Sequence, residues 1–198
     1  MLDYEEYYFG AEKGKIKYDY QKMGDMILDK KTDLMFWKQI TVYELMDYAC
    51  ILCAYWDESM LETFRSEQNK TEIYDKVSDD LKMCYKVFCE RYSKNSDAVA
   101  VFGYILEVYY FTIMVTQALT ETVTDHDDTI IMDEGTKLQE QASKMGNPIA
   151  IAIRELDKKG KEVRVKVKEA IEYLKTHFPK ESITVELLNY FFTSIENS

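Results

Sequence analysis

The chain has 198 residues, of which 36 are acidic and 25 basic, and it carries a formal net charge of -11. Hydrophobic residues make up 46% of it, which is typical of a folded protein and excludes a disordered one. The acidic balance argues against direct binding of nucleic acid, and only two prolines and seven glycines argue against a turn-rich β fold. We therefore expect a mainly α-helical protein.

Residues 1–18 are aromatic and charged, and we interpret them as an N-terminal arm with a short strand at 15–18. We assign residues 19–198 to a single helical domain, because no linker or internal repeat interrupts them. The N-terminus lacks the basic start and apolar run of a secretory signal, so we expect a cytoplasmic protein.

Helical patterns fill the first half of this domain. One extends from Asp19 to Asp29, and another from Thr41 to about Trp56, opening with the capping box Thr41-Val-Tyr-Glu44. Ser59 opens a second box of the same type and predicts a short helix. After Thr71, apolar residues at helical spacing predict one continuous helix. They are Ile73, Val77, Leu81, Cys84, Phe88 and Tyr92.

The most apolar segment follows a predicted cap at Asn95-Ser-Asp97 and extends over about 98–122. It is long enough to cross a membrane, but Glu107 lies near its middle, where a bilayer disfavours a carboxylate. We therefore expect the central helix of a bundle, and no contact with a membrane.

The second half of the chain is less regular. Residues 124–135 are expected to form a loop, and Thr136 to open a helix that ends at Gly146. Asn147-Pro148 predicts another helix start. For residues 149–167 two interpretations stay open: two helices broken at Gly160, which we favour, or a β-hairpin. Thr184 is expected to cap the last helix.

The residues that usually carry chemistry are few. The two histidines, His126 and His177, lie in no catalytic or metal-binding motif that we can identify. The four cysteines lie in helical segments and are expected to pack as small apolar side chains. They are Cys50, Cys53, Cys84 and Cys89. No phosphate-binding loop or dinucleotide fingerprint is present, so we expect no cofactor.

The charge distribution is more informative. No basic residue occurs between Lys94 and Lys137, and six carboxylates crowd residues 121–134 together with the apolar run Ile130-Ile-Met132. Three interpretations of this segment stay open: a solvated loop that keeps an acidic protein soluble, a divalent-cation site, or apolar anchors inside an acidic rim that faces a basic partner. The predicted partner-binding residues are Glu121, Asp125, Asp127, Asp128, Ile130, Ile131, Met132, Asp133 and Glu134.

We accordingly expect a non-catalytic protein that binds a basic protein surface. One concrete form is an inhibitor that mimics nucleic acid and occupies the basic groove of a nucleic-acid-binding enzyme, as anti-defence proteins do. The alternative is a metal-dependent helical nucleotide phosphohydrolase, for which Glu169 with Glu172, or Asp75 with Asp79, supplies paired carboxylates on one helix face. A third interpretation is a self-assembling component.

Overall fold

The computed structural model describes residues 8–12, 15–18, 20–62, 70–109, 128–156 and 161–196, and side chains for 23–56, 72–109, 130–156 and 162–195. The elements in chain order are β1 (Tyr8–Glu12), β2 (Lys15–Tyr18), α1 (Tyr20–Asp29), α2 (Leu34–Gln39), α3 (Val42–Glu62), α4 (Lys70–Val87), the π-helix η3 (Phe88–Tyr92), α5 (Ser96–Val108), α7 (Asp128–Lys144), α8 (Pro148–Glu155), α9 (Lys161–His177) and α10 (Ile183–Glu196). The protein is therefore mainly α-helical, as the sequence predicts.

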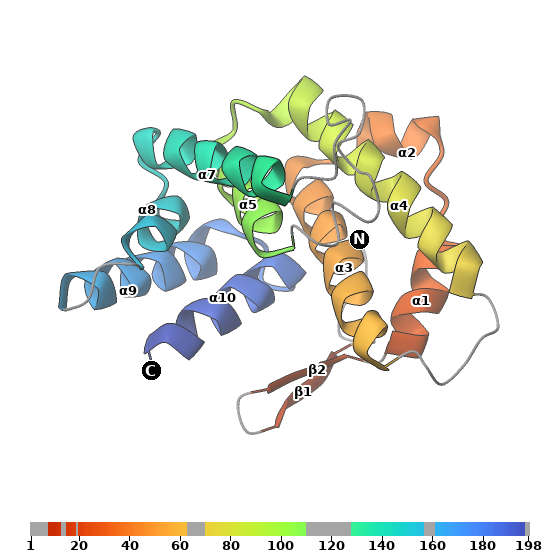
Figure 1. The fold of residues 1–198 in the computed structure, drawn as a ribbon, viewed down its shortest axis with the longest axis horizontal. Coiled ribbons are helices and arrows are strands. Elements are labelled where there is room, and N and C mark those ends of the chain that lie inside the picture. Colours follow the sequence, from red (N-terminus) through yellow and green to blue (C-terminus); the bar gives the residue numbers. More distant parts are fainter. Residues whose placement is uncertain are drawn as a thin grey trace.

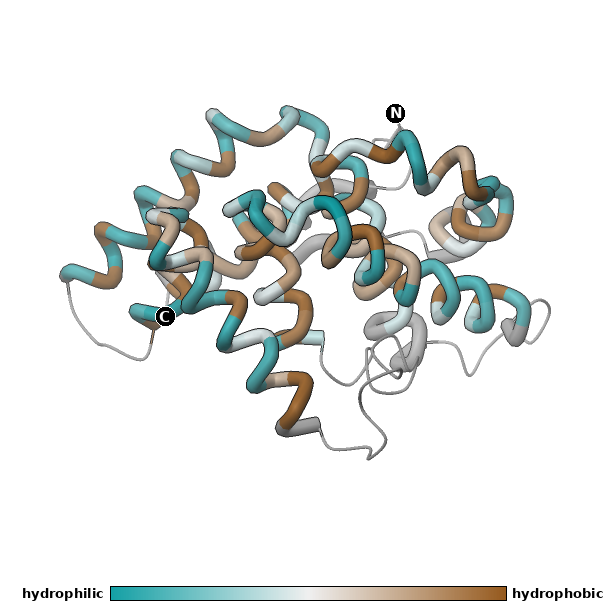
Figure 2. The backbone as a smooth tube through the Cα atoms, turned by 90° about the horizontal axis from the view of Figure 1, so that it is seen from above, coloured by the Kyte–Doolittle hydropathy of each residue, from teal (hydrophilic) through white to brown (hydrophobic). Residues whose placement is uncertain are grey.

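Helix α3 lies between two groups of helices (Figure 1). It packs against α1 and α4 on one side and against α5 and α10 on the other. From α5 the chain continues through α7, α8, α9 and α10, each of which packs on the one before. Hydrophobic and hydrophilic residues alternate along most of these helices (Figure 2), a pattern typical of helices that bury one face.

Two helical segments are enclosed on all sides. Every residue from 45 to 56 in α3 and from 97 to 106 in α5 is buried. The sequence predicts a single central helix over about 98–122. The structure describes it only to Val108, because residues 110–127 lie outside the described part, and it shows α3 as equally enclosed.

Several predicted helix starts are confirmed by their hydrogen bonds. The Thr41 amide donates to Glu44 Oε2 (3.0 Å), and the Glu44 amide donates back to Thr41 Oγ1 (3.3 Å). Asn95 caps α5 and Asn147 caps α8, each through a side-chain oxygen that accepts two amides. The predicted end at Gly146 is also present, since this glycine has a φ of 82° and closes α7.

Other predicted starts are wrong. Ser59 lies inside α3, which continues to Glu62, and Thr136 lies inside α7. At α10 the cap is Ser182, whose hydroxyl accepts the Val185 amide (3.3 Å), while Thr184 is buried and bonds to another helix.

The β-hairpin considered for residues 149–167 is not confirmed, because α8 and α9 are helical on both sides of 157–160, which lie outside the described residues. Pro148 at the first helical position and the Asn147 cap favour the helix locally. The described strands form instead an antiparallel pair of β1 and β2. Within the described ranges, no helix is long and apolar enough to cross a membrane.

Candidate partner-binding surface

The structure places most of the predicted partner-binding residues at the start of α7. Glu121, Asp125 and Asp127 lie outside the described residues. The others lie in its first two turns: Asp128, Ile130, Ile131, Met132, Asp133 and Glu134. The loop predicted for 124–135 is therefore wrong from residue 128 onward.

The inner face of α7 explains the early start. Ile131, Leu138 and Ala142 are 4%, 8% and 0% exposed, and with Gly135 they form a stripe at helical spacing that packs on α5. Burying this stripe stabilises the two turns before Thr136. Ile131 consequently faces the core, and it can contact no partner while α7 remains folded.

Two glycines allow α5 and α7 to approach closely. A Cβ atom added at Gly135 would lie 2.8 Å from Glu107 Cγ and 2.9 Å from the Glu107 backbone nitrogen, and one at Gly103 would lie 3.1 Å from the Gly135 carbonyl oxygen. Gln139 Nε2 donates to the Ala100 carbonyl (2.8 Å) inside this contact. Helix α7, which carries the candidate surface, is therefore held rigidly against α5.

Ile130 is 45% exposed and Met132 41% exposed, on the two sides of the buried Ile131. A helix turns by about 100° per residue, so these two side chains are separated by about 160° around α7 and form no single apolar patch. Ile130 instead lies beside Asp133 and Glu134, three and four residues further along. This arrangement provides one apolar anchor with an acidic rim.

The electrostatics of this end of α7 are negative. Asp133 and Glu134 lie beyond the first turn of α7, where the helix dipole no longer offsets the charge of a carboxylate. Their field reaches the neighbouring helix: burial raises the pKa of the Tyr85 hydroxyl and of the Cys89 thiol, and nearby charges, with Glu134 among them, raise both further.

The C-terminal half of α7 differs, because its charges alternate. We call Asp133, Lys137, Glu140 and Lys144 the outer stripe. Lys137 pairs loosely with Glu134 (3.6 Å), and Glu140 pairs with Lys144 (3.8 Å) and with Arg154 of α8 (3.4 Å). The side chains of all these groups are at least 40% exposed, so each pair contributes little to stability.

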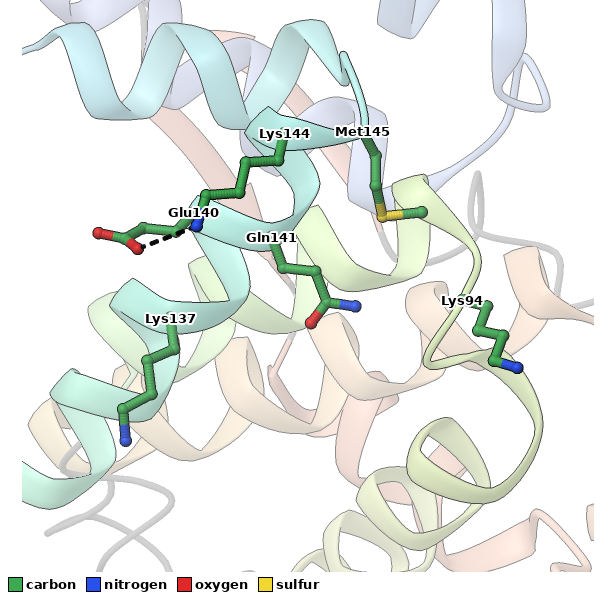
Figure 3. A pocket seen from close by; sticks show the side chains of 6 residues that line it. All are labelled: Lys94, Lys137, Glu140, Gln141, Lys144 and Met145. Carbon is green, nitrogen blue, oxygen red and sulfur yellow. Dashed lines mark ion pairs between the residues drawn. The ribbon is translucent and has the colours of Figure 1, made fainter.

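A surface pocket of about 590 Å³ adjoins the outer stripe. It is lined by Lys94, Lys137, Glu140, Gln141, Lys144 and Met145. Gln141 Nε2 donates to the Ser93 carbonyl (3.1 Å), which ties α7 to the turn before α5. Figure 3 shows the three lysine side chains pointing in different directions. Their ammonium groups do not converge, so the pocket is not arranged to hold a small anion.

Three buried carboxylates that the sequence does not single out join distant helices. Asp47 Oδ1 accepts bonds from Ser182 Oγ (2.6 Å), Thr184 Oγ1 (2.7 Å) and the Thr184 amide (3.0 Å), fixing α10 to α3. Burial raises the pKa of Asp47, and these bonds lower it in part. No local sequence pattern reveals such a contact, because its partners lie more than a hundred residues away.

Asp80 and Asp97 act in the same way. Asp80 accepts bonds from Tyr48 (2.5 Å), Thr32 (2.8 Å) and Lys76 (2.9 Å), which join α3, the α1–α2 connection and α4. Asp97 accepts bonds from Asn147 Nδ2 (2.7 Å) and Tyr173 Oη (2.9 Å), which join α5, α8 and α9. Each carboxylate is at most 7% exposed and hydrogen-bonded between helices, an arrangement typical of structural groups.

The carboxylate pairs of the alternative hypothesis lie on solvent-exposed helix faces. Glu169 bonds to Lys166 (2.8 Å), and Asp79 pairs with Lys82 (3.6 Å). In the part of the chain with described side chains, no group of three or more His, Cys, Asp or Glu side chains is arranged to hold a metal ion.

Histidine and cysteine show no catalytic arrangement among the described residues. His177 stacks on Tyr173, with ring centroids 4.0 Å apart, at the end of α9, and His126 lies outside the described residues. Cys50, Cys53 and Cys84 are buried, whereas Cys89 is exposed and differs in this from the prediction. Burial raises the pKa of Cys50 to about 12, so this thiol stays protonated and unreactive at neutral pH.

Comparison of the chain with protein-family models, with curated proteins and with solved structures finds no match.

Proposed function

We propose that this protein is a non-catalytic interaction module that binds a basic surface of a partner protein through the start of α7. The observation that carries the proposal is the exposed Ile130 beside Asp133 and Glu134 on a rigidly held helix. An apolar side chain that a partner covers contributes affinity, and the acidic rim speeds association and excludes acidic competitors.

The charge of the whole protein supports this choice of partner. A net charge of -11 attracts basic surfaces over long distances and raises the rate of encounter. The predicted residues that precede α7 add three further carboxylates at 121, 125 and 127. A basic partner would therefore meet the highest density of negative charge in the sequence next to an apolar anchor.

The use of the polar interior also supports a binding role. Asp47, Asp80 and Asp97 are committed to hydrogen bonds between helices, which suits a scaffold that presents a surface.

A concrete form of the proposal is an inhibitor that occupies a basic groove, as a mimic of nucleic acid. Only the start of α7 suits this role, because the charges alternate in sign beyond Glu134, whereas a phosphate backbone is uniformly negative. We therefore place the contact in the first two turns of α7.

The test is a pull-down with the tagged full-length protein from its native lysate, at low and at high salt. Asp133→Lys/Glu134→Lys reverses the acidic rim and changes the net charge from -11 to -7. Its matched control is Glu72→Lys/Asp75→Lys, which reverses two exposed acids near the start of α4 and gives the same net charge.

We expect the wild type and the α4 control to retain one basic partner that leaves at high salt, and the α7 variant to lose it. Equal loss from both variants would show that net charge alone governs binding, and retention by the α7 variant would place the contact elsewhere. Either result contradicts the proposal. Circular dichroism of both variants establishes that they are folded.

A further inference from the structure

The outer stripe of α7 has a charge pattern that is complementary to itself in reverse. Its residues are spaced by four, three and four, and their charges are negative, positive, negative and positive: Asp133, Lys137, Glu140 and Lys144. Read from the other end, the spacing is the same and every sign is opposite. A second copy of this stripe, running antiparallel, therefore presents a partner of opposite charge to each residue.

We propose that this protein forms a symmetric homodimer in which α7 of one copy pairs antiparallel with α7 of the other. The twofold axis crosses the interface at the level along α7 that lies midway between Leu138 and Gln139. Asp133 of each copy then faces Lys144 of the other, and Lys137 faces Glu140, which gives four intermolecular ion pairs. A closed twofold contact uses the same surface on both copies and stops at two.

The stripe is placed to make this contact. At about 100° per residue, its four side chains lie within about 60° of one another around the helix, opposite the buried face of Ile131 and Leu138. Asp133, Lys137 and Lys144 are exposed, and Glu140 is half-buried. At 1.5 Å per residue the stripe extends about 16 Å, so all four pairs form along one straight helix segment.

Apolar side chains flank the ion pairs. Ile130 is 45% exposed, and Met145, at the edge of the pocket, is 44% exposed. In this antiparallel register, Ile130 of one copy lies at the level of residue 147 of the other. Gln141 and Met145 of that other copy lie on the same side of the stripe, where they line the pocket. Two such apolar contacts, one at each end, help to seal the interface against water.

The ion pairs within each copy do not prevent this pairing. Lys137 and Lys144 lie 3.6 Å and 3.8 Å from their intramolecular partners, and both are more than two-thirds exposed. A lysine ammonium has three donors, so each can keep its own carboxylate and accept a second one from the other copy.

The net charge of -11 on each copy opposes association over long distances. At about 0.15 M salt the Debye length is about 8 Å, which screens that repulsion more than it screens ion pairs in contact. Dimerisation is therefore best measured at this ionic strength. The dimer covers Ile130 and Asp133, so a second copy and a basic partner would compete for the start of α7. The inference of a dimer does not rest on the proposed function.

Sedimentation equilibrium of the purified full-length protein tests the pairing. Asp133→Lys/Glu140→Lys makes the stripe entirely positive, and Lys137→Glu/Lys144→Glu makes it entirely negative. Each variant is expected to keep the monomer mass at concentrations where the wild type reaches twice that mass. An equimolar mixture of the two restores every pair with opposite charges, and it is expected to reach twice the monomer mass again.

Glu72→Lys/Asp75→Lys, which changes the net charge as much as the positive variant does, is expected to dimerise like the wild type. A wild type that stays monomeric up to millimolar concentration overturns the proposal. So does a mixture that stays monomeric while each variant is folded by circular dichroism. Rescue on mixing cannot arise from misfolding, so success of the mixture shows that the two copies meet through their outer stripes.

Discussion

Replacing Gly135 by alanine tests the close contact that holds α7 against α5. The added Cβ would lie 2.8 Å from Glu107 Cγ, 2.9 Å from the Glu107 nitrogen and 3.0 Å from the Gly103 oxygen. Two of these are backbone atoms, which no side-chain rotation can move. Overpacking of this kind costs up to about 3 kcal/mol, whereas alanine in place of glycine favours a helix by about 1 kcal/mol. We expect a net loss of about 2 kcal/mol.

For a chain of this size that loss lowers the melting temperature by about 4–8 °C, which thermal unfolding followed by circular dichroism measures. Gly24→Ala is the matched control, because its added Cβ would meet the ends of two side chains, Tyr55 Oη at 3.0 Å and Ile73 Cδ1 at 3.2 Å. Those ends can move, so its stability should change by less than about 1 kcal/mol. A Gly135→Ala protein as stable as the wild type would refute the close helix crossing.

Three further predictions concern Asp47 and the cysteines. Asp47→Ala leaves three donors of Ser182 and Thr184 without an acceptor and should cost about 3 kcal/mol in urea unfolding, while Asp47→Asn keeps an acceptor and should cost much less. Burial raises the pKa of Asp47 in the folded state, so the ionisation of this carboxyl costs stability as pH rises through that pKa. The wild type should therefore gain stability relative to Asp47→Asn as pH falls toward 3.8. A stability difference that stays constant with pH would contradict this. Of the four thiols, Cys89 alone is exposed and should react with a thiol reagent in the folded protein. Its rate should still be rising above pH 9, because only the thiolate reacts and burial raises the pKa of this thiol from 9.0. Prompt reaction of a second thiol would contradict the burial of the other three.

Helix starts that depend on neighbouring residues could be predicted from the sequence. Thr41 with Glu44, Asn95 and Asn147 each satisfy amides within three residues, so the local pattern was sufficient. The pattern at Thr136 looks the same but is not a cap, because its hydroxyl donates to Glu107 of α5 (3.0 Å). A capping pattern inside a helix can be told from a true helix start only by whether the turns that precede it pack against other residues.

The candidate site could be predicted only in part, because its geometry depends on contacts between distant residues. The sequence reveals that acidic and apolar residues occur together near 130, but their orientation depends on the α5–α7 contact. That contact buries Ile131, exposes Ile130, and rests on two glycines 32 positions apart, Gly103 and Gly135. Lys137, Glu140 and Lys144 lie in the helix that the sequence predicts, but Asp133 joins their stripe only once α7 is known to begin at Asp128.

The most direct test of the proposed binding surface is oxidative footprinting of the protein with and without its captured partner, read by mass spectrometry. Ile130, the apolar anchor at the start of α7, is 45% exposed, and Leu34 of α2 is 74% exposed and serves as an internal reference in the same molecule. We expect the partner to lower the oxidation of Ile130 severalfold and to leave Leu34 unchanged. Unchanged oxidation at Ile130 in the complex would contradict the assignment of the start of α7 as the binding surface.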